Sequence, residues 1–107
     1  MMWTSKEYNE WIQKGCPINL NVTKLNISFS NIKSLNGIEN LHNLTTLNCS
    51  NNQLISLKGI ENLINLTYLN CSYNQLTSLN GIENLHKLIN VKCDDLEKST
   101  NIPIKKN

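Results

Sequence analysis

Hydrophobic and polar residues alternate in a pattern that repeats every 22 residues along most of the chain. The segments 23–44, 45–66 and 67–88 align without gaps, and a fourth begins at Ile89 before the pattern fades. One glycine recurs in every segment, and the same step backwards reaches Gly15, so the residues before the first full unit form a worn half-repeat. A fixed period of this length predicts a repeat architecture, in which each unit buries its apolar face against its neighbours.

Each unit predicts one short strand and one compact return leg. In the second unit, one polar residue separates Leu47 from Cys49, which places both side chains on the same face of a strand. The apolar residues that follow recur at every third position, a spacing that fits a 3₁₀ turn or an extended segment better than an α-helix. A glycine within the leg also disfavours a long helix. The leg positions are Leu57, Ile60, Leu63 and Leu66.

Two nearly identical stretches, LNCSNNQL at 47–54 and LNCSYNQL at 69–76, carry a resemblance to a known family. Together with the leucines that precede them, they resemble the leucine-rich repeat consensus, over roughly residues 18–96. The unit length and the GIENL segment are similar to the short class found in bacterial internalins and in a eukaryotic regulator of protein phosphatase 1. The abundance of Asn also resembles the repeat proteins encoded by giant DNA viruses of amoebae. The matching positions are Leu44, Leu47, Cys49, Asn52 and Leu54, and then Leu66, Leu69, Cys71, Asn74 and Leu76.

This resemblance implies an α/β repeat fold. The expected object is a short leucine-rich-repeat solenoid with a parallel sheet on its concave face, 3₁₀ or extended return legs and an N-terminal capping helix. Its length suits a single domain over 1–107. The predicted parts are a cap helix and worn half-repeat at 1–22, full repeats at 23–44, 45–66 and 67–88, and a partial repeat with a tail at 89–107.

The first residues predict the cap of this solenoid. Thr4 and Glu7 have the T-x-x-E spacing of a capping box, in which each side chain bonds the other residue's backbone N–H. We therefore expect a helix over about residues 5–14 that lays Trp11 and Ile12 over the first repeat. The alternative is that the tryptophans of this segment form a docking patch. Covering the core is favoured, because an uncapped end would expose leucines.

The C-terminal end offers no matching helix. Asp94 and Asp95 are expected to discourage a further strand from joining the sheet edge. Three readings of this end stay open. The apolar residues Ile102 and Ile104 fold back over the last repeat, or the chain is a shortened copy of a longer repeat protein, or the edge meets a partner.

The cysteines suggest either a metal or disulfide site or a part of the core. In a parallel sheet, residues one period apart become neighbours at about 4.8 Å. Ile27 then shares one inward column with three cysteines, which favours small buried thiols. Side chains in such a row cannot surround a tetrahedral zinc ion, and they lack disulfide geometry. We therefore expect no cofactor and no metal. The cysteines of this column are Cys49, Cys71 and Cys93.

The repeated asparagines divide into two sets. Asn52 and Asn74 stand where the chain leaves the strand, and in leucine-rich repeats the matching amide points inward and bonds the backbone of adjacent turns. Ser30 and Leu96 replace it in the end units. The second set is expected on the concave face, either as a self-satisfied ladder of stacked amides or as a polar binding strip. Its members are Asn26, Asn48 and Asn70.

Composition and charge exclude several function classes. Net charge is +2 and the basic residues are dispersed, which argues against binding to nucleic acid or to a membrane surface. No apolar run approaches the roughly 20 residues of a membrane span, and no secretory signal pattern is present, so an intracellular (cytoplasmic) location is expected. His42 and His86 share a column with Ile64, and the Glu column of the return legs fits a solvated face. No catalytic constellation results, and the chain is expected not to be an enzyme.

The leading hypothesis is a protein–protein interaction module that binds a protein or peptide through the concave face. Aromatic side chains commonly anchor interfaces, so Phe29, Tyr68 and Tyr73 are predicted contacts. The alternative is a structural or degenerate repeat paralogue without a specific partner, which the near-identity of the second and third units favours. A monomer is expected, and association through a sheet edge stays open. The remaining candidate contacts are Asn48, Asn70 and Lys92.

Overall fold

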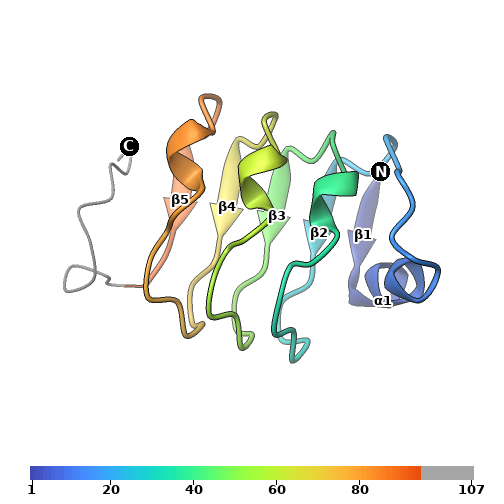
Figure 1. Cartoon of the computed structure of the whole chain (residues 1–107), viewed down its shortest axis with the longest axis horizontal. Helices are drawn as coiled ribbons and strands as arrows, with labels where there is room; N and C mark the ends of the chain where they lie inside the picture. The colour runs from blue at the N-terminus through green and yellow to red at the C-terminus, as the bar shows by residue number, and fades with distance from the viewer. Residues whose placement is uncertain (95–107) are drawn as a thin grey trace.

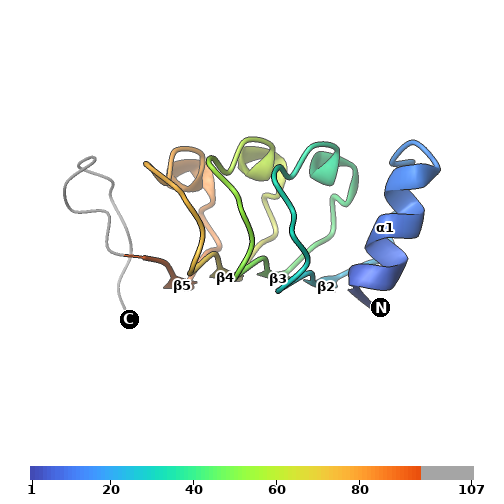
Figure 2. The same ribbon diagram turned by 90° about the horizontal axis from the view of Figure 1, so that it is seen from below.

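The repeat pattern folds into an open parallel sheet with a layer of 3₁₀ turns behind it. The computed structural model describes residues 1–94 of the chain. Five strands lie side by side in chain order, and the return legs form the second layer (Figures 1 and 2). The elements are β1 (Met2–Thr4), α1 (Ser5–Gln13), β2 (Lys24–Asn26), η1 (Ile38–Asn40), β3 (Thr46–Asn48), η2 (Ile60–Asn62), β4 (Tyr68–Asn70), η3 (Ile82–Asn84) and β5 (Asn90–Lys92).

Neighbouring strands pair at one full period. Thr46 of β3 lies opposite Tyr68 of β4, which in turn lies opposite Asn90 of β5. Each repeat therefore places a given position of the sequence one strand spacing from its copy in the next repeat. The predicted parallel sheet, 3₁₀ legs and N-terminal helix are confirmed, while the division of the chain into units stays a prediction.

The core lies between the sheet and the return legs. Leu47 and Leu69 point inward from β3 and β4 and are fully buried, because side chains alternate between the two faces of a strand. Ile60 of η2 closes the same space from the opposite layer. Since each unit buries its leucines against its neighbours, a single unit could not hold this core alone.

Each 3₁₀ turn starts at a glycine with a left-handed backbone. Gly59 has a φ of 104° and Gly81 has a φ of 107°, a region that residues with a Cβ seldom adopt. Their N–H groups donate to the carboxylates of Glu61, at 2.9 Å, and Glu83, at 2.7 Å. The Glu column of the return legs, expected as a plain solvated face, therefore also fixes the start of two turns.

Two inward-pointing amides join adjacent turns of the backbone where the strands end. The Nδ2 group of Asn52 donates to three carbonyl oxygens, and its Oδ1 accepts from two N–H groups of the preceding turn. Asn74 repeats the donor pattern one turn later. This confirms the role predicted for both residues. The acceptors around Asn52 are Ile27, Cys49 and Ser50, and the donors are Ser30 and Ile32.

A carboxylate takes over this role at the last described turn. Asp94 Oδ1 accepts the N–H of Tyr73 at 2.8 Å, and Asp94 Oδ2 accepts the N–H of Asn74 at 3.2 Å. An ionised carboxylate has acceptors only, so it satisfies these donors without offering a donor to a further strand. The acidic end of the repeat region thus has a definite structural role. Asp95, Leu96, Ile102 and Ile104 lie outside the described residues.

The N-terminal cap contains a strand that the sequence pattern did not predict. β1 pairs in parallel with β2, and Trp3 lies opposite Leu25, one period away. Residues 1–22 therefore form a full turn of the solenoid, in which α1 follows β1 directly. In the sequence, the step from Trp3 to Leu25 is the one signal for this strand, and the other residues among 1–22 that match the repeat pattern begin only at Gly15.

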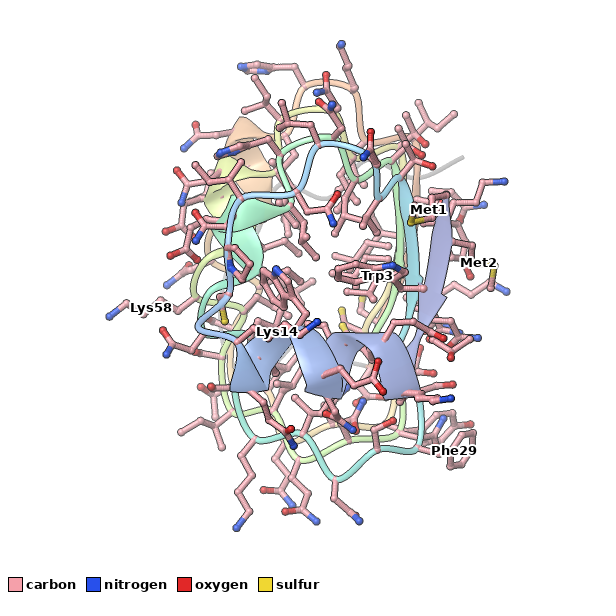
Figure 3. All side chains as sticks on the ribbon, turned by 90° about the vertical axis from the view of Figure 1, so that its right-hand side faces the viewer. Met1, Met2, Trp3, Lys14, Phe29 and Lys58 are labelled. Carbon is pink, nitrogen blue, oxygen red and sulfur yellow. The ribbon has the colours of Figure 1, made fainter. Side chains whose placement is uncertain are left out.

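The predicted cap helix and its capping box are confirmed, but Ile12 does not belong to the buried side of the helix. The N–H and the hydroxyl of Thr4 both donate to Glu7 Oε1 at 2.8 Å. Ile12, expected over the first repeat, is 41% exposed, whereas Tyr8 is fully buried and Trp11 is 3% exposed. Because β1 holds the residue before the helix in the sheet, the Tyr8 and Trp11 side of α1 turns toward the core. Figure 3 shows α1 lying across this end of the molecule.

Trp11 joins the parts of the cap. Its ring centroid lies 6.1 Å from that of Trp3 and 5.6 Å from that of Tyr8, in tilted arrangements that aromatic pairs prefer. Its Nε1–H donates to the carbonyl oxygen of Pro17 at 2.7 Å, which holds the loop after the helix. The indole of Trp11 is part of the core, so the alternative of an exposed docking patch of two tryptophans is wrong.

We expect Trp11→Ala to lower the free energy of unfolding by about 3–5 kcal/mol, because it removes a buried aromatic ring and leaves a cavity. Ile12→Ala, on the exposed side of the same helix, should change it by less than about 0.5 kcal/mol. Urea denaturation followed by circular dichroism measures both variants. Equal destabilisation by the two substitutions would contradict this orientation of α1.

Candidate protein-binding surface

The outward-facing residues of the repeat strands and the residues just after them form one polar face, which we call the sheet surface. They alternate with the buried residues because of the pleat of the strands. The face carries amides and hydroxyls, with one exposed lysine near each end. It comprises Lys24, Asn26, Ser28, Thr46, Asn48, Ser50, Tyr68, Asn70, Ser72, Asn90, Lys92 and Asp94.

The structure brings four of the six predicted contact residues together on this surface. Asn48, Asn70 and Lys92 are direct partners in neighbouring strands and form one row. Tyr68 is half-buried and lies on the same face of β4, two residues before Asn70. The other two predicted contacts lie in a separate row, in the turns that follow the strands.

The amides of the sheet surface do not form the stacked ladder that we considered. Asn48 Oδ1 accepts from the backbone N–H of Ser50 at 3.1 Å and from its hydroxyl at 2.7 Å. The backbone bond recurs at Asn26 with Ser28 and at Asn70 with Ser72. Within residues 1–94, no hydrogen bond joins one of these side-chain amides to the next. Local bonding two residues along the chain, typical of Asn, has taken the place of the ladder.

The row of turns that follows β2, β3 and β4 forms the edge of the sheet surface, which we call the rim. Its equivalent positions Phe29, Asn51 and Tyr73 all have a left-handed backbone, with φ of 54°, 56° and 58°. Phe29 is 78% exposed and Tyr73 is 72% exposed. Figure 3 shows Phe29 at the edge of the molecule, away from the core. The rim consists of Phe29, Asn31, Asn51, Gln53, Tyr73 and Gln75.

The backbone of the rim is unfavourable for an aromatic residue. A left-handed backbone costs about 1–2 kcal/mol for most residues with a Cβ, and Asn is among the few that visit it routinely. Asn51 shows which residue type this position accepts with little strain. Phe29 and Tyr73 recover little of that free energy by burial, since both rings are largely in solvent. Strain of this kind at an exposed position points to a role outside the fold.

The titratable groups buried behind the sheet are held neutral. Burial raises the pKa of the Cys49 thiol to about 12, and it also raises the pKa of the Cys71 thiol and of the Tyr8 hydroxyl. Cys49 and Cys71 are fully buried, as predicted, whereas Cys93, which was predicted in the same buried column, is partly exposed, and so is Cys16. Within residues 1–94, no group of three or more His, Cys, Asp or Glu side chains is placed to hold a metal ion. No helix in the same range is long and apolar enough to cross a membrane.

Comparison with known proteins bears on the fold. Neither a protein-family model nor a curated protein matches the chain. Among solved structures, internalin C2 of Listeria monocytogenes matches over 71% of this chain, with a TM-score of 0.64 and 26% sequence identity. The fold is a short leucine-rich-repeat solenoid. The match spans 36% of the internalin chain, so what the whole internalin does is not carried over. The likenesses to the phosphatase regulator and to the Asn-rich proteins of giant DNA viruses stay predictions.

We expect alkylation of the native protein to separate the cysteines. The thiolate is the reactive form, so Cys49 and Cys71 should resist a reagent such as iodoacetamide, while Cys16 and Cys93 should react first. Mass spectrometry of the resulting peptides identifies the modified sites. Rapid modification of Cys49 in a folded protein, or a melting temperature that falls when EDTA is added, would contradict a buried-thiol column.

The same burial predicts how stability depends on pH. The pKa of Cys49 is higher in the folded chain than the usual value of about 8.5 for an exposed thiol. The free energy of unfolding is therefore unaffected by this thiol below about pH 8.5, and it falls as pH rises toward 12. The reason is that the Cys49 thiol loses its proton at a lower pH in the unfolded chain than in the folded one. Denaturation at a series of pH values, with Cys49→Ser for comparison, measures this decline.

We expect Tyr73→Asn to raise the free energy of unfolding by about 1 kcal/mol, because it relieves strain at a left-handed position. Tyr68→Thr, which copies Thr46 of the preceding repeat into a strand, should bring no such gain. Chemical denaturation of the two variants and the wild type measures the difference. A clear loss of stability in Tyr73→Asn would show that the exposed ring supports the fold.

Proposed function

We propose that this chain is a non-enzymatic protein-interaction module that binds a protein or peptide through the sheet surface and the rim. The observation that carries this proposal is the exposed, strained pair Phe29 and Tyr73. Stability alone would favour Asn at both positions, as at Asn51. Aromatic rings are frequent anchors of interfaces, so contact with a partner is the physical reason for keeping them.

The arrangement of the sheet surface supports binding by rows of side chains. Asn48, Asn70 and Lys92 form one row, and Tyr68 lies beside it. Four repeat strands span only about 15 Å at the usual strand spacing, so the footprint suits a short peptide or one loop of a partner. The structural likeness to an internalin supports binding over catalysis as an analogy from the fold.

A structural or degenerate repeat paralogue is the second candidate. The near-identity of the second and third units supports it, because an unused surface has no reason to diverge. Against it stands the single difference between the two eight-residue stretches, which places Tyr73 where the preceding unit has Asn51. A monomeric state, an intracellular location and the absence of nucleic-acid and membrane partners stay predictions from the sequence.

Capture from a lysate of the cells that express the protein tests the proposal. The bait is the wild-type chain, compared with the triple variant Phe29→Asn, Tyr68→Thr and Tyr73→Asn, in which residues of the second repeat replace the aromatic ones. We expect a partner that the wild type retains and the triple variant loses. Folding of both baits is checked first by circular dichroism.

The matched control for this capture is Ile64→His. It changes an exposed apolar side chain after η2, away from the sheet surface, to the residue found at His42 and His86. The control should retain the partner. Loss by the control as well would show non-specific adhesion, and the absence of any specific partner for the wild type would favour the degenerate paralogue.

A further inference from the structure

The rim combines features that together define one kind of peptide. Phe29 and Tyr73 are the most exposed of the large apolar side chains in residues 1–94, and both belong to the rim. They occupy equivalent positions two repeats apart, with Asn51 between them. We infer that the rim binds a proline-rich segment in the polyproline II conformation. This inference rests on the proposed protein-binding function and specifies the class of partner.

The spacing of the two aromatic positions is fixed by the backbone. The N–H of Phe29 donates to the carbonyl oxygen of Ser50 at 3.2 Å, and the N–H of Asn51 donates to that of Ser72 at 2.9 Å. The parallel register of the strands thus continues through the rim positions. Two strand spacings separate the positions of Phe29 and Tyr73, or roughly 9.6 Å.

This spacing selects among peptide conformations. A polyproline II helix rises about 3.1 Å per residue with three residues per turn, so side chains three apart lie on one face about 9.3 Å apart. An extended strand repeats on one face at about 6.6–6.8 Å, and an α-helix rises about 5.4 Å per turn. Two prolines three residues apart in polyproline II therefore match the spacing of the two aromatic positions better than equivalent side chains of a strand or an α-helix do.

The polar groups of the rim suit the backbone of such a peptide. Polyproline II has no internal hydrogen bonds, so its carbonyl oxygens need donors from solvent or from a partner. The rim offers side-chain amides that form no hydrogen bond within residues 1–94. One of them, Asn51, lies between the two aromatic positions. The amide-bearing residues are Asn31, Asn51, Gln53 and Gln75.

Charge near the rim indicates where a basic residue of the peptide would lie. None of the six rim residues is charged, so the central part of the ligand needs no charged group. At one end, the carboxylate of Asp94 accepts the backbone N–H of Tyr73 at 2.8 Å, which places a negative charge beside the backbone of that residue. A basic residue flanking the proline next to Tyr73 would be attracted to this carboxylate. The predicted ligand is therefore two prolines three residues apart, followed or preceded by Lys or Arg.

Titration of the full chain with synthetic peptides tests this inference. The probe is an alanine-based peptide with two prolines three residues apart and one flanking arginine. The control peptide has the same composition with the prolines four residues apart. Changes in backbone amide chemical shifts report the site. We expect shifts centred on residues 28–31, 50–53 and 72–75, and at least tenfold weaker binding of the control peptide.

Matched variants complete the test. Tyr73→Asn should weaken binding of the probe at least tenfold, while Ile64→His, at an exposed position after η2 and away from the sheet surface and the rim, should leave it unchanged. Absence of shifts at the rim at millimolar probe, equal binding of both peptides, or shifts confined to β2–β5 would overturn the inference. The last result would indicate an extended peptide on the sheet surface instead.

The two proposals fail in different ways. If the lysate capture yields a partner that depends on the aromatic residues while the proline peptide does not bind, the protein-binding function stands and the polyproline II partner is wrong. If the peptide binds at Phe29 and Tyr73 but no protein is captured, the rim binds this chemistry, while the proposed function as a protein-binding module in the cell loses its support and the degenerate paralogue is favoured. Failure of both would count against both proposals.

Discussion

Hydrogen bonding of the backbone at the strand ends is the constraint on which the rest of this structure depends. Each strand has three residues, so most polar groups of a turn lie outside the ladder between strands. Asn52 and Asn74 satisfy those groups from inside the solenoid, and the carboxylate of Asp94 does so at the last described turn. Each backbone group left buried without a partner would cost about 1–3 kcal/mol, a large fraction of the stability of a small domain.

The same bonds turn a repeat in the sequence into a surface with fixed dimensions. Because the turns are joined through their backbones, residues 22 apart must lie one strand spacing from each other, inside and outside the core. Inside, this stacks leucine on leucine. Outside, it sets the row of Asn48, Asn70 and Lys92 and the separation of Phe29 from Tyr73. Any ligand of this face must therefore match a spacing that the core has already determined.

Features that recur in each repeat could be predicted from the sequence, and features that occur once could not. The strands, the 3₁₀ legs and the inward Asn52 follow from a pattern seen several times over. β1 occurs once, and its pairing with β2 is a tertiary contact, so the exposure of Ile12, which shares a helical face with Tyr8 and Trp11, could not be predicted. The hydrogen bonding of Asn48 was open because a neighbouring amide and Ser50 are both suitable partners. Exposure of Phe29 and Tyr73 could be predicted, while their left-handed backbone could be suspected only from Asn51.

Differences among the repeats separate what the fold requires from what it does not. Buried positions keep nearly the same side chain because each leucine packs against its own copy in the next turn, where a change of shape would leave a void. Exposed positions also lie beside their copies, but no close packing constrains their shape, and there the second repeat has Thr46 and Asn51 where the third has Tyr68 and Tyr73. Sequence drift that is constrained only by stability would favour Asn at a position with a left-handed backbone. Aromatic residues at Phe29 and Tyr73 run against this preference for Asn. They stand on the rim, where the backbone bonds between turns fix the spacing of side chains. A partner gains affinity from a pair of contacts that is already in place before binding.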